Sequence, residues 1–512
     1  MSGSRFGSHG TLGAPTAWAR GRARVLAGAV ASAVLVTASF PPLDLAPLAW
    51  IALVPLFVVL RDARPGLGAL AGSTFAVALC ALLASWLPGL VDGFFAVGLG
   101  GSLALASGVA LYFALPFALL GAGLAAAGNR AGPIAVGAAW WCCEALRFAG
   151  PLELPWALLA YSQSAVLPFV QAADTVGALG LGAVLAAANA VLAEVVRGLR
   201  RPAFPRVESA VVLASLIAAW LYGTDALRHH FEQGDALDVV VVQGGLSRTQ
   251  RLAPDAHADN LGHYLALSER AGPNADLVVW PELALRFDPS QRPDLWQEFS
   301  EHTRRSTADW LVGAPGSRTR ALLREPVNTA LLVRAGRIRG RHEKVRLVPF
   351  SETQPRWSPI ERSRFAAGLS LHPLEGEAAR VGVLLCSEAL FPALARELAA
   401  KGANLLVNPS NDDWFASPAA TAHQVAVGVF RAVENRRPWL RPSTTGSSVV
   451  IDAHGRVLAR APYGEPAVLR ARVHPTNVNS PRARLANWVP PAASGALLSC
   501  VWLFAVGRRR PE

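Results

Sequence analysis

Long apolar blocks occupy most of the first 230 residues and constrain the fold of this chain more than any other feature. Seven blocks lie at 25–40, 44–60, 67–90, 94–126, 133–148, 174–197 and 208–223, and an eighth lies at 489–507. A membrane-spanning helix needs about 20 apolar residues, so several of these blocks can cross a bilayer. The first two are short and are separated by Pro41 and Pro42, so they either cross singly or form a re-entrant pair. The sequence therefore predicts an integral membrane protein.

Positive charge alternates between the segments that join these blocks. Arginines lie in the N-terminal tail, in the second, fourth and sixth loops, and in the tail after the eighth block, whereas the odd loops carry acidic residues and no basic ones. Cytoplasmic loops are enriched in Lys and Arg, so we expect both termini in the cytoplasm and the long segment after block seven outside it. These topology-setting arginines account for much of the net charge of +12, which argues against a nucleic-acid partner.

A different pattern begins near residue 235. Short β-rich runs alternate with helical stretches such as 254–272 and 418–436, which is typical of a layered α/β domain with buried strands. The runs lie at 237–243, 276–280, 309–313, 328–334, 380–385, 403–408 and 447–452. We therefore predict a transmembrane domain at 1–230, an α/β domain at 231–480, and a C-terminal span with a basic tail at 481–512.

Three reactive side chains lie at the ends of runs in the α/β part. Glu282 follows the run VVW, Lys344 precedes RLVPF, and Cys386 ends VGVLL. Lys344 and Lys401 are the only lysines among 48 basic residues, and Cys386 is the only cysteine outside the apolar blocks. Side chains at the carboxyl ends of strands converge in layered α/β domains, so a carboxylate, an amine and a thiol could meet there.

These residue types together suit acyl transfer. A carboxylate can take the proton of a thiol, the thiolate can attack an ester or amide carbonyl, and a fixed ammonium can stabilise the resulting oxyanion. Glu352 would orient the lysine or the base, and Glu388 the loop after the nucleophile. Taken singly, a cysteine is commonly a buried apolar residue, and a Glu or Lys a surface one. No histidine shows ligand spacing and no glycine-rich phosphate loop is present, so we expect no metal and no cofactor.

Several segments carry a resemblance to a known family. They are VVWPE (278–282), EKVRLVPFSE (343–352), LLCSEALFP (384–392), NPSNDDWF (408–415) and RAVENRRPWLRPSTTGSS (431–448). In these motifs, in its multi-span N-terminal half and in its C-terminal span, the chain resembles the apolipoprotein N-acyltransferases. The resemblance implies a multi-span α-helical membrane domain joined to an α/β nitrilase-like αββα sandwich domain.

The same resemblance implies roles for particular residues. Glu282 would be the general base, Lys344 the oxyanion stabiliser and Cys386 the nucleophile. Supporting roles are implied for Glu352, Glu388 and Ser387, and substrate contacts for Trp414, Phe350 and Phe415.

The implied activity transfers an acyl chain from a membrane phospholipid to the N-terminal α-amine of the diacylglyceryl-cysteine of an apolipoprotein. A cysteine thioester would link the two steps, so no ATP, metal or other cofactor is required. The implied setting is the bacterial cytoplasmic (inner) membrane, with the catalytic domain on the periplasmic side and the protein acting as a monomer.

Three positions differ from the family pattern and leave alternatives open. Ser351, Ser387 and Thr444 stand where Gly, Tyr and Asn are usual. One alternative is a membrane-tethered nitrilase-type amidase that uses water as the acceptor; a closed polar pocket would favour it, and a lipid-sized opening would favour transfer. The other is a transporter or a non-catalytic lipoprotein-binding homologue, although no inverted repeat is evident.

Overall fold

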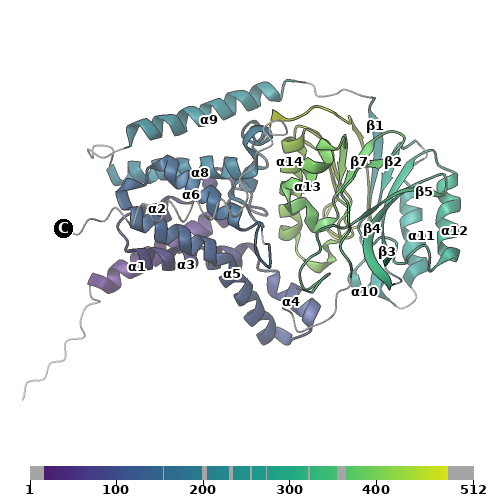
Figure 1. Cartoon of the computed structure of the whole chain (residues 1–512), viewed down its shortest axis with the longest axis horizontal. Helices are drawn as coiled ribbons and strands as arrows, with labels where there is room; N and C mark the ends of the chain where they lie inside the picture. The colour runs from purple at the N-terminus through teal and green to yellow at the C-terminus, as the bar shows by residue number, and fades with distance from the viewer. Residues whose placement is uncertain are drawn as a thin grey trace, which may run out of the picture.

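The computed structural model consists of a bundle of apolar helices followed by an α/β sandwich, which lie side by side in Figure 1. The structure describes residues 17–153, 155–198, 205–229, 235–253, 256–272, 274–320, 323–354 and 365–481. The eighth apolar block, 489–507, lies outside the described residues, so its crossing stays a prediction.

The helical part follows the apolar blocks of the sequence. Its elements are α1 (Ala17–Ala38), η1 (Ala46–Trp50), α2 (Val54–Leu60), α3 (Pro65–Leu83), α4 (Leu87–Phe95), α5 (Gly98–Ala127), η2 (Gly128–Arg130), α6 (Pro133–Leu146), η3 (Leu159–Gln163), α7 (Leu167–Val170), α8 (Ala173–Gly198) and α9 (Arg206–Ala226). Among the described residues, five stretches are long and apolar enough to cross a membrane: Arg20–Ala38, Pro65–Leu83, Gly98–Arg130, Ala173–Gly198 and Arg206–Ala226. Two shorter apolar stretches, Ala46–Leu60 and Pro133–Leu146, complete the set.

Two blocks that we expected to be continuous are interrupted. Block 44–60 is divided into η1 and α2, and block 67–90 is divided into α3 and α4. The second helix of each block has a proline in its first turn, Pro55 in α2 and Pro88 in α4. Proline lacks an N–H and fits the first turn of a helix but breaks its interior, so these prolines start new helices.

Helices α3 and α5 pack closely because glycines line their contact. A Cβ added at Gly72 would collide with the backbone carbonyl of Phe117, and one at Gly121 would collide with the backbone of Gly68. Small residues of this kind let apolar helices approach closely where lipid offers no hydrophobic driving force.

The sandwich has two six-stranded sheets. Their orders are β12-β1-β2-β3-β4-β5 and β11-β10-β9-β8-β7-β6. The strands are β1 (Leu237–Gln243), β2 (Leu277–Val279), β3 (Asp309–Arg320), β4 (Leu323–Arg334), β5 (Arg337–Glu343), β6 (Leu374–Glu375), β7 (Arg380–Val383), β8 (Leu405–Val407), β9 (Trp439–Arg441), β10 (Val449–Ile451), β11 (Val457–Arg460) and β12 (Ala467–Val473). The helices are α10 (Arg248–Leu252), α11 (Ala256–Glu269), α12 (Pro293–Arg304), η4 (Cys386–Leu390), α13 (Pro392–Ala400), η5 (Asp412–Trp414) and α14 (Pro418–Asn435).

Alternation along each strand sends side chains to two different cores. Val239 and Val241 of β1 face the second sheet, whereas Val240 and Val242 pack beneath α11 and α12. Helices α13 and α14 cover the other sheet, and Figure 1 shows them between the sandwich and the helical bundle. This layer order of helix, sheet, sheet, helix confirms the predicted αββα sandwich beside a helical membrane domain.

Buried polar contacts attach α14 to the helical bundle. Arg436 Nη2 lies 2.5 Å from Asp174 Oδ2 of α8, and Glu434 Oε1 accepts a 2.9 Å hydrogen bond from the backbone N–H of Ala178. Arg431 donates to the hydroxyl of Tyr161 at 3.1 Å. Since burying a charge without a partner is costly, these pairs fix one orientation of the sandwich on the bundle.

The close contact of α3 with α5 gives a first prediction. Gly72→Val should lower the free energy of unfolding by about 1–3 kcal/mol or more, because the new side chain overpacks the contact at Phe117. Gly108→Val on α5 is the matched control, since a Cβ there meets nothing within 4 Å. Thermal unfolding of both variants in detergent measures the difference. Equal melting temperatures would contradict this account of the packing.

Candidate active site

Three predicted site residues leave the sandwich where strands of the two sheets end. Glu282 lies just after β2, Lys344 directly follows β5, and Cys386 opens η4 after β7. Strand β2 is parallel to β1 and β3 in one sheet, and β7 is parallel to β8 in the other. The carboxyl ends of β2 and β7 bring Glu282 and Cys386 to the same end of the sandwich.

A buried ammonium lies between two carboxylates at this end. Lys344 Nζ is 3.0 Å from Glu282 Oε1 and 2.8 Å from Glu352 Oε1, and the lysine side chain is only 1% exposed. Asn328 of β4 donates to the same two oxygens, at 2.8 Å to Glu282 and 3.2 Å to Glu352. The structure therefore joins Glu282, Lys344 and Glu352 in one cluster, as the sequence predicted.

The cluster sets the charge states of its members. Burial alone would lower the pKa of Lys344, but the carboxylates of Glu282 and Glu352 raise it well above its ordinary value, so the amine is a permanent cation. Burial raises the pKa of Glu282, assisted by the neighbouring Glu352 and opposed by Lys344. Glu282 is thus a stronger base than an ordinary carboxylate, which suits a group that must take a proton from a thiol.

Cys386 is held in a conformation that few residues adopt. Its φ is +48°, and its backbone N–H donates a 2.8 Å hydrogen bond to the carbonyl of Pro409. Burial and the charge of Glu282 raise the pKa of the thiol, while Lys344 acts in the opposite direction. The resting group is therefore a protonated thiol that interacts electrostatically with both a base and a cation, and it needs proton removal before it can attack.

Glu388 forms hydrogen bonds to the backbone of two loops that carry site residues. Its Oε1 accepts hydrogen bonds from the backbone N–H groups of Val345 at 2.7 Å and Arg346 at 3.0 Å, and its Oε2 accepts one from Leu385 at 2.7 Å. His342 Nε2 lies 3.5 Å from Oε2. Burial raises the pKa of Glu388, but His342 and the Arg346 backbone donor outweigh it and bring the value below normal. Glu388 thus ties the segment after Lys344 to the residue before Cys386.

Sequence reasoning named Trp414 and Phe415 in the loop after β8 but missed the polar residues at its start. Asn408 Nδ2 donates to the carbonyls of Leu384 at 2.6 Å and Cys386 at 3.0 Å. The backbone N–H of Asn411 donates to Glu282 Oε2 at 3.1 Å, and Arg441 pairs with Asp412 at 2.8 Å. The polar run NPSNDD directly after an apolar strand was the available signal. Asn328 and His342 offered no comparable signal, because each lies inside a strand.

A polar cavity of about 290 Å³ opens beside the cluster. Glu282 and Glu352 form part of its wall, together with Ser351, Trp414 and three arginines. The three predicted substrate aromatics lie between this cavity and the bundle. Trp414 stacks on Phe94 of α4 at 4.4 Å between ring centroids, Phe415 packs on Trp86 at 4.9 Å, and Phe350 lies 6.4 Å from Phe95. Only Trp414 of the three contributes to the wall of this cavity.

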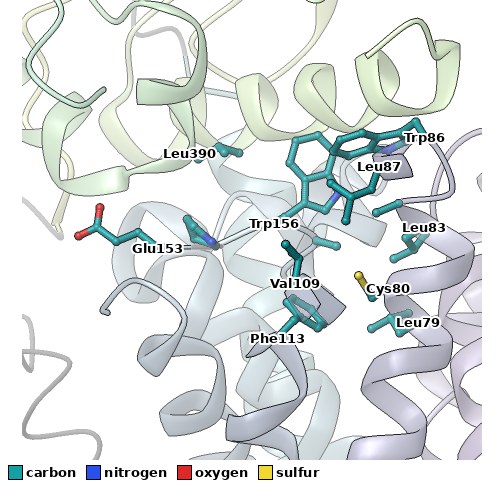
Figure 2. A pocket seen from close by; sticks show the side chains of 13 residues that line it. Leu79, Cys80, Leu83, Trp86, Leu87, Val109, Phe113, Glu153, Trp156 and Leu390 are labelled. Atoms are coloured by element: carbon teal, nitrogen blue, oxygen red, sulfur yellow. The ribbon is translucent and has the colours of Figure 1, made fainter. Parts of the chain in front are cut away.

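A second cavity, of about 110 Å³, lies inside the bundle and is almost wholly apolar. Figure 2 shows Leu79, Cys80 and Leu83 on one side, Val109 and Phe113 below, and Trp86 and Trp156 above. Leu390 reaches this cavity from the sandwich, and it is the last residue of η4, the short helix that Cys386 opens. The short helix that begins at Cys386 therefore extends from the polar site to an apolar cavity bordered by the membrane helices.

The described residues contain no group of three or more His, Cys, Asp or Glu side chains that could hold a metal ion. The chemistry of the site is that of a carboxylate, an ammonium and a thiol. A two-sheet sandwich with this site, packed on apolar helices, defines a membrane-bound enzyme of the carbon-nitrogen hydrolase type.

Comparison with known proteins identifies the family within that class. A carbon-nitrogen hydrolase family model matches residues 239–482, and a model of the apolipoprotein N-acyltransferase N-terminal domain matches residues 32–191. The apolipoprotein N-acyltransferase of Geobacter metallireducens is 33% identical over 87% of this chain and 88% of its own length. That of Azotobacter vinelandii is 32% identical over 94% and 95%. The chain belongs to the apolipoprotein N-acyltransferase family and is a membrane acyltransferase, which confirms the resemblance.

Asn328 gives a prediction for the site. Its amide lowers the pKa of Glu282, so Asn328→Ala should raise that pKa and leave less ionised base at a given pH. We expect the acid limb of the pH–rate profile to move to higher pH by about one unit. At pH values on that limb, the rate should fall by about tenfold. Asn274→Ala, at an exposed position, is the control. An unmoved acid limb would contradict the assignment of Asn328 to the base.

Proposed function

We propose that this enzyme N-acylates the diacylglyceryl-cysteine of apolipoproteins with Cys386 as nucleophile, Glu282 as general base and Lys344 as oxyanion stabiliser, taking its acyl chain from a membrane phospholipid. The observation that carries the proposal is the cluster in which Lys344 Nζ lies 3.0 Å from Glu282 and 2.8 Å from Glu352, next to the Cys386 thiol. Water as the acceptor, in an amidase with the same site, is the alternative that the tests below exclude or establish.

The first step forms a thioester. Glu282 takes the proton of Cys386, and the sulfur attacks the ester carbonyl of the phospholipid, so that a C–S bond forms and the C–O bond to glycerol breaks. The ammonium of Lys344 stabilises the oxyanion at the tetrahedral stage, together with the backbone N–H of Ser387. Glu282 then returns the proton to the departing glycerol oxygen, and the lysophospholipid leaves.

The second step forms the amide. The α-amine of the apolipoprotein attacks the thioester carbonyl, a C–N bond forms and the C–S bond breaks, and a proton passes through Glu282 from the amine to the thiolate. An amide is more stable than a thioester, so the transfer needs no ATP or metal. An acyl donor and an acyl acceptor that occupy the same site in turn suit a ping-pong cycle.

The surroundings of Cys386 support a lipid substrate. Leu390 links the nucleophile's helix to the apolar cavity of Figure 2, which suits an acyl chain, and Phe415 packs on Trp86 in the roof of that cavity. An aromatic cover limits the access of water to the thioester and so favours transfer over hydrolysis.

The proposal extends to placement in the cell. We place the catalytic sandwich, 231–480, on the periplasmic side of the bacterial inner membrane, with the transmembrane domain 1–230 and the C-terminal span 481–512 leading to cytoplasmic termini, and with a monomer as the active form. The alternation of arginine-rich and acidic loops supports this orientation.

Mass spectrometry after incubation with phospholipid tests the nucleophile. The wild type should carry an acyl mass on the peptide that contains Cys386, and Cys386→Ala should carry none and should acylate no lipoprotein. Cys142→Ala, at a buried cysteine on α6, is the matched control and should keep the adduct. Acylation by the Cys386→Ala variant would show that another group is the nucleophile. A thioester that is hydrolysed by water and is not transferred to the amine of the lipopeptide would favour the amidase.

The chain's two lysines allow a matched test of the ammonium. Lys344→Arg should lower the rate of thioester formation by about 100-fold or more, because a planar guanidinium cannot replace a compact ammonium between two carboxylates. Lys401→Arg is the control, since Lys401 lies at the end of α13 and pairs with Glu397 at 2.8 Å. Single-turnover kinetics measure both variants. A normal rate for Lys344→Arg would exclude the oxyanion role.

A further inference from the structure

Three arginines line the polar cavity beside the Glu282–Lys344–Glu352 cluster. Arg248 and Arg251 come from α10, and Arg286 comes from the loop after β2. The chemistry proposed above uses none of them. Their positive charge is therefore available for another purpose.

Three carboxylates of the cavity wall, Glu282, Glu352 and Asp413, face four cations, Lys344 and the three arginines. Glu282 and Glu352 share Lys344, and Asp413 Oδ2 lies 2.7 Å from Arg251 Nε. Arg251 also donates to Asn411 Oδ1 at 3.3 Å and is buried, so it is fixed in place. Asp413 thus pairs with Arg251, whereas neither Arg248 nor Arg286 forms an ion pair among the described residues, and the wall keeps one surplus positive charge.

Arg286 is the least satisfied of the three. Among the described residues it makes no hydrogen bond and no ion pair, and its Nε is buried without an acceptor. Burial lowers the pKa of Arg286, assisted by the like charge of Arg251 and opposed by Asp413. A half-buried guanidinium without an anion is costly, and a bound anion would offset that cost.

Arg248 connects the cavity to the membrane side. Its guanidinium stacks over Trp414 at 4.4 Å and donates to the carbonyl of Gly93 at 3.2 Å. Gly93 belongs to α4, and the next residue of that helix, Phe94, also stacks on Trp414. An anion that entered from the lipid surface along α4 would therefore meet Arg248 first and Arg286 within the same cavity.

We infer that Arg286, with Arg248, binds the phosphodiester of the phospholipid acyl donor. The inference rests on the proposed function and adds a subsite to it. A planar guanidinium recognises phosphate oxygens with paired hydrogen bonds, and one phosphodiester carries the single negative charge that the cavity lacks. The polar cavity then takes the headgroup side of the donor while the apolar cavity takes an acyl chain, so the ester between them lies at Cys386.

The first test measures phospholipid binding to a variant that cannot react with it. In the Cys386→Ala protein, we expect Arg286→Gln to raise the Kd of a short-chain diether phospholipid by about tenfold, the loss of one charge-assisted hydrogen bond. Arg286→Lys should recover most of the affinity, because it restores the charge. Arg305→Gln is the control, since Arg305 is exposed beyond α12. An unchanged Kd for Arg286→Gln would overturn the inference, and Arg248→Gln provides the same measurement if Arg286→Gln does not fold.

Turnover with two donors separates a phosphate subsite from a general defect. For a phospholipid donor, Arg286→Gln should raise KM by about tenfold and change kcat by less than about twofold, because the lost contact is made equally in the ground state. For the p-nitrophenyl ester of a fatty acid, which has no phosphate, both constants should match the wild type. Equal losses with the two donors would assign Arg286 to folding or chemistry and overturn the inference.

Two further outcomes are distinguishable. Inorganic phosphate that bound the Cys386→Ala protein as tightly as the diether lipid would make this a site for free phosphate and overturn the assignment to the donor. If the diether lipid bound in an Arg286-dependent way while the wild type formed no acyl adduct, the proposed acyl transfer would fail and the phosphodiester subsite would stand.

Discussion

The contact on which the site depends is the sharing of one buried ammonium by two carboxylates. Lys344 Nζ reaches both Glu282 and Glu352 within 3.0 Å, and Asn328 donates to the same oxygens. The two carboxylates and the ammonium offset part of one another's cost of burial. The arrangement keeps a cation close to Cys386 and leaves Glu282 more basic than usual, which suits the proposed roles of Glu282 as base and Lys344 as oxyanion stabiliser.

The second constraint is the attachment of the sandwich to the bundle. Helix α14 covers one sheet and also pairs with α8 through Arg436 and Asp174, so the same helix belongs to the catalytic core and to the membrane interface. The end of the sandwich that carries Cys386 is held against α4 and the roof formed by Trp86 and Trp156. A polar cavity with arginines and an apolar cavity lined by Leu390 consequently lie at this end of the sandwich, a pair that suits the proposed phospholipid donor.

Sequence reasoning recovered the residues whose type is rare in their surroundings. Cys386 and Lys344 were conspicuous because the α/β part has one cysteine and the chain has two lysines, and Glu282 was conspicuous because it follows a buried strand. Asn328 and His342 could not be found in this way, since a polar residue inside a strand has no distinguishing local pattern. Phe350 and Phe415 were named as substrate contacts from motifs alone; they pack on α4 and on Trp86, so that assignment stays a prediction.

Hydropathy and strand periodicity by themselves predicted the apolar helices and the α/β class, because both are local patterns along the chain, and residue chemistry singled out Cys386, Glu282 and Lys344 as candidate site residues. Only the tertiary structure decided that Asn328 and the backbone of Asn411 donate to Glu282, and that Arg286 forms no ion pair among the described residues. Each of these relations depends on segments that are distant in sequence, and it exists only once burial has removed water as the competing partner.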